Sequence, residues 1–184
     1  MAINQERDGP ICSELFNGLE PLPSNMTLGA TWRPENAAAV GRIGGRELDA
    51  IGVNMLLGPV LDVATNTAPG NGNLGVRSFG GDPCWVGLMG QAYTGGLHLG
   101  SNGRLAVIAK HFPGIGSSDR AVAQEIPTVR KSLDELRKVE LAPFFAVTGS
   151  APNEAQMVEG LLATHIRYQR FPGQYSSVNR SGRL

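Results

Sequence analysis

Four short apolar runs lie along the chain at intervals that suit a protein of alternating strands and helices. They span residues 2–4, 53–62, 104–110 and 157–165. The second and third runs are almost continuously apolar rather than alternating, which is typical of parallel strands buried on both faces. The pattern therefore predicts four buried strands, the first of which is very short.

Segments with helical spacing separate these strands. Residues 36–51 and 84–99 each repeat apolar side chains every three or four positions, which predicts one helix in each segment. The first of these helices contains three glycines, Gly41, Gly44 and Gly45. Glycine lowers helix propensity, so this helix needs tertiary packing to hold it together.

A third helix is predicted by a capping box. Ser132 is followed three positions later by Glu135, and each side chain can satisfy a backbone N–H group that the first helical turn leaves unpaired. The helix is expected to run to about Leu141, where Pro143 ends or kinks it.

The predicted order of elements is strand, helix, strand, helix, strand, helix, strand. Such alternation implies right-handed crossovers between parallel strands. Both a doubly wound sheet and a (β/α)8 barrel have this pattern. No internal repeat, charge block or linker-like stretch divides the chain, so a single region is expected over residues 1–184.

Composition narrows the function classes. The chain has 184 residues, 41% of them hydrophobic, and 16 basic residues balance 16 acidic ones. A net charge of zero argues against a nucleic-acid groove or a polybasic membrane patch. No apolar run approaches the ~18 residues of a membrane span. The two cysteines match no metal-ligand spacing, so neither a metal nor a cofactor is expected.

Polar residues follow every predicted strand. In parallel α/β folds the carboxyl ends of the strands build the active site, so these residues are candidates for one shared site. They are Asn4, Gln5 and Glu6 after the first strand, Asp62 and a long loop leading to Arg77 after the second, Lys110 and His111 at the third, and Thr164 and His165 at the fourth.

Two of these features allow more than one interpretation. Residues 70–75 match the pattern G-x-G-x-x-G but do not directly follow a strand, so a loop that carries Arg77 is favoured over a nucleotide site. Lys110 could be a Schiff-base lysine, a hydrogen-bond donor to a neutral substrate, or the ion-pair partner of a carboxylate. The adjacent His111 and the Phe-Pro-Gly turn favour a fixed binding corner.

The segment Lys-His-Phe-Pro-Gly-Ile-Gly at residues 110–116 resembles a hallmark of family 3 glycoside hydrolases, especially their bacterial β-N-acetylhexosaminidase branch. Further segments that resemble this family follow in the right order. They are residues 2–6, 45–63, 77–83 and 132–144, and the resemblance extends over roughly residues 2–172.

The resemblance implies a (β/α)8 TIM barrel that is incomplete here, with about four strands and three helices. A complete barrel has eight strands and about 250 residues. The implied activity is hydrolysis of terminal β-linked sugars with retention. N-acetyl-β-glucosaminides are the first choice of substrate, and β-glucosides or β-xylosides are the alternative within the family.

The resemblance also implies that Arg77, Lys110 and His111 bind the non-reducing sugar. Charged donors form stronger hydrogen bonds to sugar hydroxyls than neutral donors do. Asn4 stands where the family normally has a carboxylate that binds sugar hydroxyls. Asparagine keeps an acceptor but loses the charge, so altered sugar recognition is expected.

Two differences between this chain and the family pattern concern the catalytic groups. The hexosaminidase branch carries a general acid/base histidine in the next loop, where this chain has Ala121 or Val122. Asp119 is a candidate carboxylic acid in that loop, although it could instead pair with Arg120 or cap the turn. The family's nucleophile is an Asp on a strand after the fourth predicted one, so this chain alone is expected to lack glycosidase activity.

The alternatives from other classes are a non-catalytic sugar-binding paralogue and a Schiff-base lyase that uses Lys110. The amino terminus turns polar at once, so residues 1–6 are not expected to form a signal peptide, and any leader is expected upstream in a longer parent protein. The sequence predicts neither the compartment nor the oligomeric state.

Overall fold

The fold is built on a four-stranded parallel sheet. The computed structural model describes residues 1–184 except 7–12, 16, 66–73, 120–125 and 171–184. The sheet has the order β1-β2-β3-β5, and its strands are β1 (Ala2–Ile3), β2 (Met55–Val60), β3 (Ala106–Phe112) and β5 (Gly160–Ala163). All four predicted strands are therefore confirmed, and their parallel pairing is that of an incomplete barrel.

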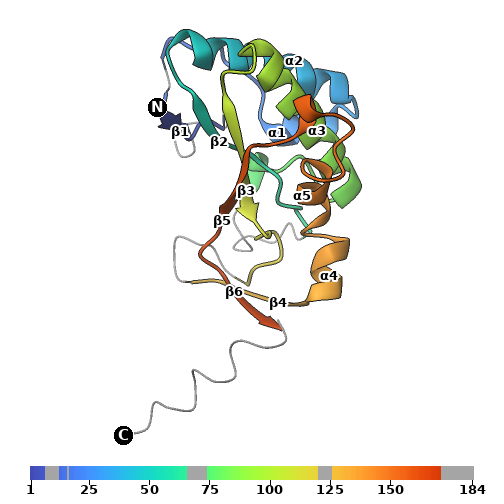
Figure 1. The fold of residues 1–184 in the computed structure, drawn as a ribbon. Coiled ribbons are helices and arrows are strands. Elements are labelled where there is room, and N and C mark those ends of the chain that lie inside the picture. Colours follow the sequence, from blue (N-terminus) through green and yellow to red (C-terminus); the bar gives the residue numbers. More distant parts are fainter. Residues whose placement is uncertain (7–12, 16, 66–73, 120–125, 171–184) are drawn as a thin grey trace, which may run out of the picture.

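Helices lie together on one side of this sheet (Figure 1). They are α1 (Asn25–Ala30), α2 (Pro34–Ala50), α3 (Pro83–Gly100) and α5 (Ala142–Ala146). The two long helices, α2 and α3, match the two predicted from apolar spacing. Helix α1 was not predicted, because six residues are too few to show an apolar period, although Ser24 caps it by accepting a hydrogen bond from the Thr27 N–H.

Glycines of both α2 and α3 let the backbones of the two helices approach closely. A Cβ atom on Gly45 would lie 2.2 Å from the Leu97 carbonyl oxygen, and one on Gly96 would lie 2.2 Å from the Ala38 carbonyl oxygen. A side chain at either position would therefore force the helices apart. This contact confirms that tertiary packing holds a helix whose intrinsic propensity is low.

The third predicted helix is confirmed at its start and wrong at its end. Ser132 and Glu135 form the expected capping box at the start of α4 (Leu133–Lys138). The helix does not continue to Leu141, and Pro143 begins helix α5 instead of ending α4. Proline fits the first turn of a helix because the N–H group it lacks would have no helical partner there.

A second, two-stranded parallel sheet was not predicted. It pairs β4 (Thr128–Ser132) with β6 (Arg167–Arg170). Their sequences, Thr-Val-Arg-Lys-Ser and Arg-Tyr-Gln-Arg, are too short and polar to show a strand pattern. The described residues thus form six strands and five α-helices, more than the four strands and three helices expected from the sequence.

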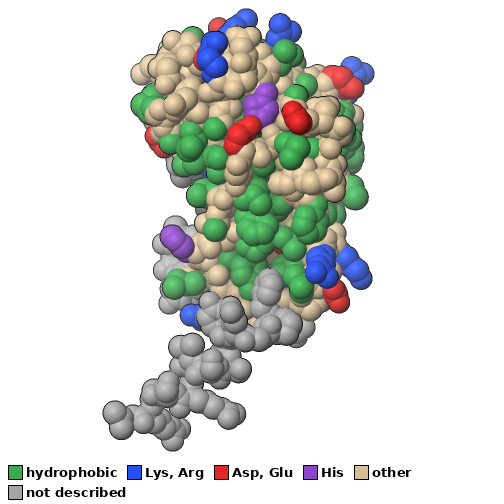
Figure 2. Space-filling model, in the orientation of Figure 1, with side chains coloured by type: hydrophobic (Ala, Val, Ile, Leu, Met, Phe, Trp, Pro, Cys, Tyr) green, Lys and Arg blue, Asp and Glu red, His purple; other side chains and the backbone are tan. Residues whose placement is uncertain are grey.

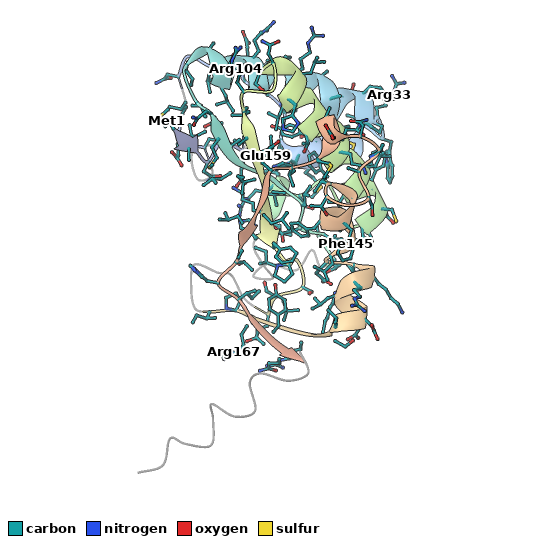
Figure 3. The ribbon with its side chains drawn as sticks, in the orientation of Figure 1. Met1, Arg33, Arg104, Phe145, Glu159 and Arg167 are labelled. Atoms are coloured by element: carbon teal, nitrogen blue, oxygen red, sulfur yellow. The ribbon has the colours of Figure 1, made fainter. Side chains whose placement is uncertain are left out.

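Strand direction places the small sheet beside the carboxyl ends of the main one. Arg104 lies just before β3, and Arg167, in β6, lies at the opposite end of the molecule (Figure 3). The strands of the main sheet run from the first end toward the second. The carboxyl ends of these strands therefore point toward the β4–β6 pair (Figure 1).

The core fills the space between the main sheet and its helices. Its strand side chains include Ile3, Leu56 and Val107, and α3 contributes Val86, Met89 and Leu97. Hydrophobic side chains also gather on the surface over β5 and α5 (Figure 2), where Phe145, Met157, Leu161 and Leu162 are exposed. Within the described ranges, no helix combines the length and apolar character that crossing a membrane requires.

Candidate functional site

A buried carboxylate, Glu6, gathers the charged groups at the carboxyl end of the sheet. The Arg77 Nε and Nη2 atoms donate to its two oxygens at 2.5 and 2.9 Å. Lys110, near the end of β3, forms an ion pair with the Glu6 Oε1 atom. The side chains of Glu6 and Lys110 are each 3% exposed. Three elements far apart in the sequence therefore meet at one carboxylate.

The surroundings of Glu6 keep it ionised. Burial raises the pKa of Glu6 and is the largest single influence on it. The Arg77 hydrogen bonds and the positive charge of Lys110 together outweigh burial, so the pKa of Glu6 lies below its ordinary value of 4.5. At neutral pH the site thus contains a charged acceptor between two cations.

Asn4 belongs to the same cluster. Its Oδ1 atom accepts a hydrogen bond from the Lys110 Nζ atom. The Asn4 backbone is fixed by Glu14, because the Asn4 N–H donates to the Glu14 carboxylate at 3.0 Å and the Glu14 N–H donates to the Asn4 carbonyl at 3.1 Å. Asn4 therefore lies at a defined position beside Lys110.

His111 connects the cluster to a second buried carboxylate, Asp62. The Arg77 Nη2 atom lies 3.3 Å from the His111 Nε2 atom, and the His111 Nδ1 atom lies 2.7 Å from the Asp62 Oδ2 atom. A guanidinium group only donates, so we assign Nε2 as the acceptor and place the ring proton on Nδ1, facing Asp62. Asp62 thereby sets both the orientation and the tautomer of the ring.

The loop after Lys110 and His111 is fixed at several points. The Asp62 Oδ1 atom accepts from the Ile115 N–H at 2.8 Å. The Tyr168 hydroxyl, on β6, donates to the Gly114 carbonyl at 2.8 Å. Burial, followed by the negative charges of Asp62 and Glu140, raises the pKa of Tyr168, which keeps its hydroxyl a donor. The described part of this loop is therefore held by hydrogen bonds at the boundary of the site.

Asp119 occupies a different position. Its Oδ1 atom accepts from the Thr128 N–H at 2.8 Å, and its own N–H donates to the Thr128 carbonyl at 3.1 Å. Its Oδ2 atom lies 4.0 Å from a guanidinium nitrogen of Arg130. These contacts fix the start of β4 and fit the alternative that Asp119 caps a turn. Arg120, Ala121 and Val122 lie outside the described residues.

The four predicted sugar-binding residues, Asn4, Arg77, Lys110 and His111, are thus brought together by direct contacts. The sequence places Glu6 and Asp62 near strand ends but predicts no role for either. Position is the one signal that marks them, because each follows a strand whose neighbour in the sheet also ends in polar residues. Of residues 70–75, 70–73 are not described, and Gly75 begins the 3-10 helix Gly75–Arg77.

The described residues contain no group of three or more metal-ligating side chains arranged to hold an ion. Cys84 is a free, exposed thiol, and Cys12 lies in a segment that the structure does not describe. The groups that the cluster presents are charged and neutral hydrogen-bond donors and two carboxylate acceptors.

The fold and the site define a barrel-type α/β protein, present in part, whose polar cluster lies where such barrels bind their substrates. A comparison with family models then identifies the family. Residues 4–181 match the "Glycosyl hydrolase family 3 N terminal domain". The chain belongs to glycosyl hydrolase family 3.

Individual relatives agree with this assignment. The chain is 33% identical over 151 residues to a "Beta-hexosaminidase" of Neisseria meningitidis serogroup C, an alignment that covers 78% of this chain and 40% of the relative. A Pseudomonas aeruginosa "Beta-hexosaminidase" is 28% identical over 98% of this chain and 50% of its own length. The chain therefore spans about half of these relatives or less.

Solved structures show the same fold. A family 3 β-N-acetylglucosaminidase from Paenibacillus sp. str. FPU-7 superimposes with a TM-score of 0.78 and 34% identity, over 91% of this chain and 29% of that protein. NagZ from Neisseria gonorrhoeae, solved with N-trifluoroacetyl-D-glucosamine, gives a TM-score of 0.76 and 29% identity over 91% of this chain and 47% of its own.

Proposed function

We propose that this chain carries the sugar-binding half of a family 3 catalytic barrel, and that the complete protein hydrolyses terminal N-acetyl-β-glucosaminides with retention. The observation that carries the proposal is the single Glu6 carboxylate that holds Arg77 and Lys110 side by side, with Asn4 against Lys110. The names of the relatives, β-hexosaminidase and β-N-acetylglucosaminidase, support the substrate class.

The chemistry of the cluster suits a sugar. A pyranose presents several hydroxyl groups, each of which can accept and donate a hydrogen bond. Lys110 and Arg77 are charged donors already oriented by Glu6, so little side-chain entropy is lost when a hydroxyl binds. The 3.3 Å contact between Arg77 and the His111 Nε2 atom is longer than an ordinary hydrogen bond, so a sugar hydroxyl that comes closer can compete for that nitrogen.

Hydrolysis requires more than this cluster provides. A retaining glycosidase uses a carboxylate nucleophile about 5–5.5 Å from a general acid/base. We place the nucleophile on a later part of the barrel, in agreement with relatives of about twice the aligned length. Asp119 remains the candidate acid within this chain, although its bond to the Thr128 N–H supports a structural role.

The Schiff-base alternative is disfavoured by the surroundings of Lys110. An amine must lose its proton before it can attack a carbonyl group. The Glu6 carboxylate, in direct contact with the Lys110 Nζ atom, stabilises the protonated ammonium group instead. A role as a fixed hydrogen-bond donor agrees better with this arrangement.

The proposal is tested by calorimetric titration of the chain with methyl N-acetyl-β-glucosaminide and, in parallel, with methyl β-glucoside and β-xyloside. We expect saturable binding, tightest for the first sugar, that Lys110→Met abolishes and Lys138→Met leaves unchanged, because Lys138 is exposed on α4. We also expect no release of nitrophenol from the corresponding nitrophenyl glycosides. Equal binding by the Lys110→Met variant would contradict the proposed site.

A further inference from the structure

The side-chain amide of Asn4 has a fixed orientation. The Lys110 ammonium group can only donate hydrogen bonds, so the Asn4 atom that it contacts is the carbonyl oxygen Oδ1. The Nδ2 atom, with two N–H groups, is the other end of the same amide. It donates to no protein atom in the described part of the chain, and Asn4 is partly exposed. The open polar group of Asn4 is therefore a donor.

An asparagine at this position therefore offers a ligand a hydrogen-bond donor, where a carboxylate would offer an acceptor. An aspartate there would accept from Lys110 with one oxygen and present a second, negatively charged acceptor with the other. Asn4 presents N–H groups instead. A ligand group that meets Asn4 must therefore accept a hydrogen bond, whereas one that meets an aspartate must donate it.

The charges of the cluster also favour a hydrogen-bond acceptor, in particular an anionic one, next to Asn4. Arg77 and Lys110 carry two positive charges, and the carboxylates near Asn4 are the buried Glu6 and Asp62 and the exposed Glu14, which accepts from the Asn4 N–H. A carboxylate at position 4 would add a further negative charge and repel an anion. With a neutral amide there, an anionic group next to Lys110 meets a positive charge and a neutral donor.

We propose that Asn4 makes this site selective for a terminal N-acetylhexosamine that carries a carboxylate substituent. The carboxylate would accept from the Asn4 Nδ2–H group and lie close to the Lys110 ammonium group. This inference rests on the proposed sugar-binding function and adds the chemical class of the terminal sugar. It assigns Asn4 as the residue that determines specificity.

The test compares one neutral sugar with two anionic ones in calorimetric titrations of the full chain. The probes are the methyl β-glycosides of N-acetylglucosamine, N-acetylmuramic acid and N-acetylglucosaminuronic acid, which place the carboxylate on different ring positions. Each is titrated into the natural chain and into the Asn4→Asp and Asn4→Ala variants. Asn36→Asp adds the same charge at an exposed site on α2 and serves as the control.

We expect the natural chain to bind at least one anionic sugar about tenfold more tightly than the neutral sugar, as one charge-assisted hydrogen bond allows. Asn4→Asp should reverse this preference, Asn4→Ala should remove it, and Asn36→Asp should retain it. Tighter binding of the neutral sugar by the natural chain, or equal preferences in the natural chain and Asn4→Asp, overturns the inference and leaves the proposed function standing. If no sugar binds at all, the proposed function fails together with the inference.

Discussion

The imidazole of His111 donates from its Nδ1 atom to the Oδ2 atom of Asp62 at 2.7 Å, and this carboxylate has no exposed surface. Asp62 follows β2, and His111 lies in β3, so the contact joins the carboxyl ends of neighbouring strands. The same carboxylate accepts from the backbone N–H of Ile115. Asp62 thus positions both the His111 ring, which faces Arg77, and the loop that contains Ile115.

We expect Asp62→Asn to weaken both folding and sugar binding. An amide oxygen is a weaker acceptor than a carboxylate, and the amide nitrogen would face donors that it cannot accept from. Hydrogen bonds to charged groups contribute about 1.5–3 kcal/mol each, so a loss of at least 2 kcal/mol in the free energy of unfolding is expected. Urea denaturation measures it.

The matched control is Asp134→Asn. Asp134 has a side chain that is 85% exposed, and its ion-pair partner among the described residues is Arg137, at 3.6 Å. Its replacement should change the free energy of unfolding by no more than about 0.5 kcal/mol. Equal effects at the two positions would show that Asp62 has no special role in the loop.

The lowered pKa of Glu6 predicts a specific dependence of stability on pH. A group with a lowered pKa in the folded state stabilises the fold above its ordinary value of 4.5, and this contribution disappears as the pH falls through the folded-state value. Glu6→Gln should therefore be much less stable than the natural chain near neutral pH. The difference should shrink below pH 4.5. A difference that is constant with pH would contradict this account.

Gly45 tests the close packing of α2 against α3. In an isolated helix, Gly→Ala would be stabilising by up to about 1 kcal/mol. Here the new methyl group would lie 2.2 Å from the Leu97 carbonyl oxygen, so we expect a net destabilisation of about 1–3 kcal/mol. Gly149→Ala, where no atom lies within 4 Å, should have little effect. Thermal unfolding measures the stability of both variants, and equal stability of the two would contradict this packing.

The capping box of α4 gives a prediction about local stability. Ser132→Ala removes the hydroxyl group that accepts from the Glu135 N–H at 3.3 Å. A loss of about 1 kcal/mol is expected, as for other N-caps. Ser150→Ala, at an exposed position after α5, is the control. Amide hydrogen exchange should show faster opening of residues 133–138 only in the first variant.

Much of the fold could be predicted because the two central strands, β2 and β3, carry a strong, simple signal. Val107 and Ala109 have no exposed surface, and burial on both sides of β3 leaves a nearly continuous apolar run in the sequence. Strands β4 and β6 lack this signal, since they pair at the edge of the molecule and keep polar side chains. Pro143 was misinterpreted because proline is compatible both with the end of one helix and with the first turn of the next.

The residues of the candidate site also fall into those that the sequence could predict and those that it could not. Lys110 and His111 are polar residues at the end of an apolar strand, so the sequence alone marks them as candidate site residues. Glu6 and Asp62 act through contacts that span 71 and 49 residues, to Arg77 and His111 respectively. Such long-range pairing depends on strand order and register, which local sequence patterns do not contain. The proposed sugar-binding role of Arg77 comes from resemblance to a family, and the structure supplies the carboxylate that orients its side chain.

The proposed sugar-binding function depends most directly on where a sugar binds. A titration of the isotope-labelled chain with methyl N-acetyl-β-glucosaminide, followed by amide chemical shifts, locates the site residue by residue. We expect saturable shifts concentrated at Asn4, Arg77, Lys110 and His111. Shifts that are absent from these four residues, or that centre on the outer surface between α2 and α3, would contradict the account.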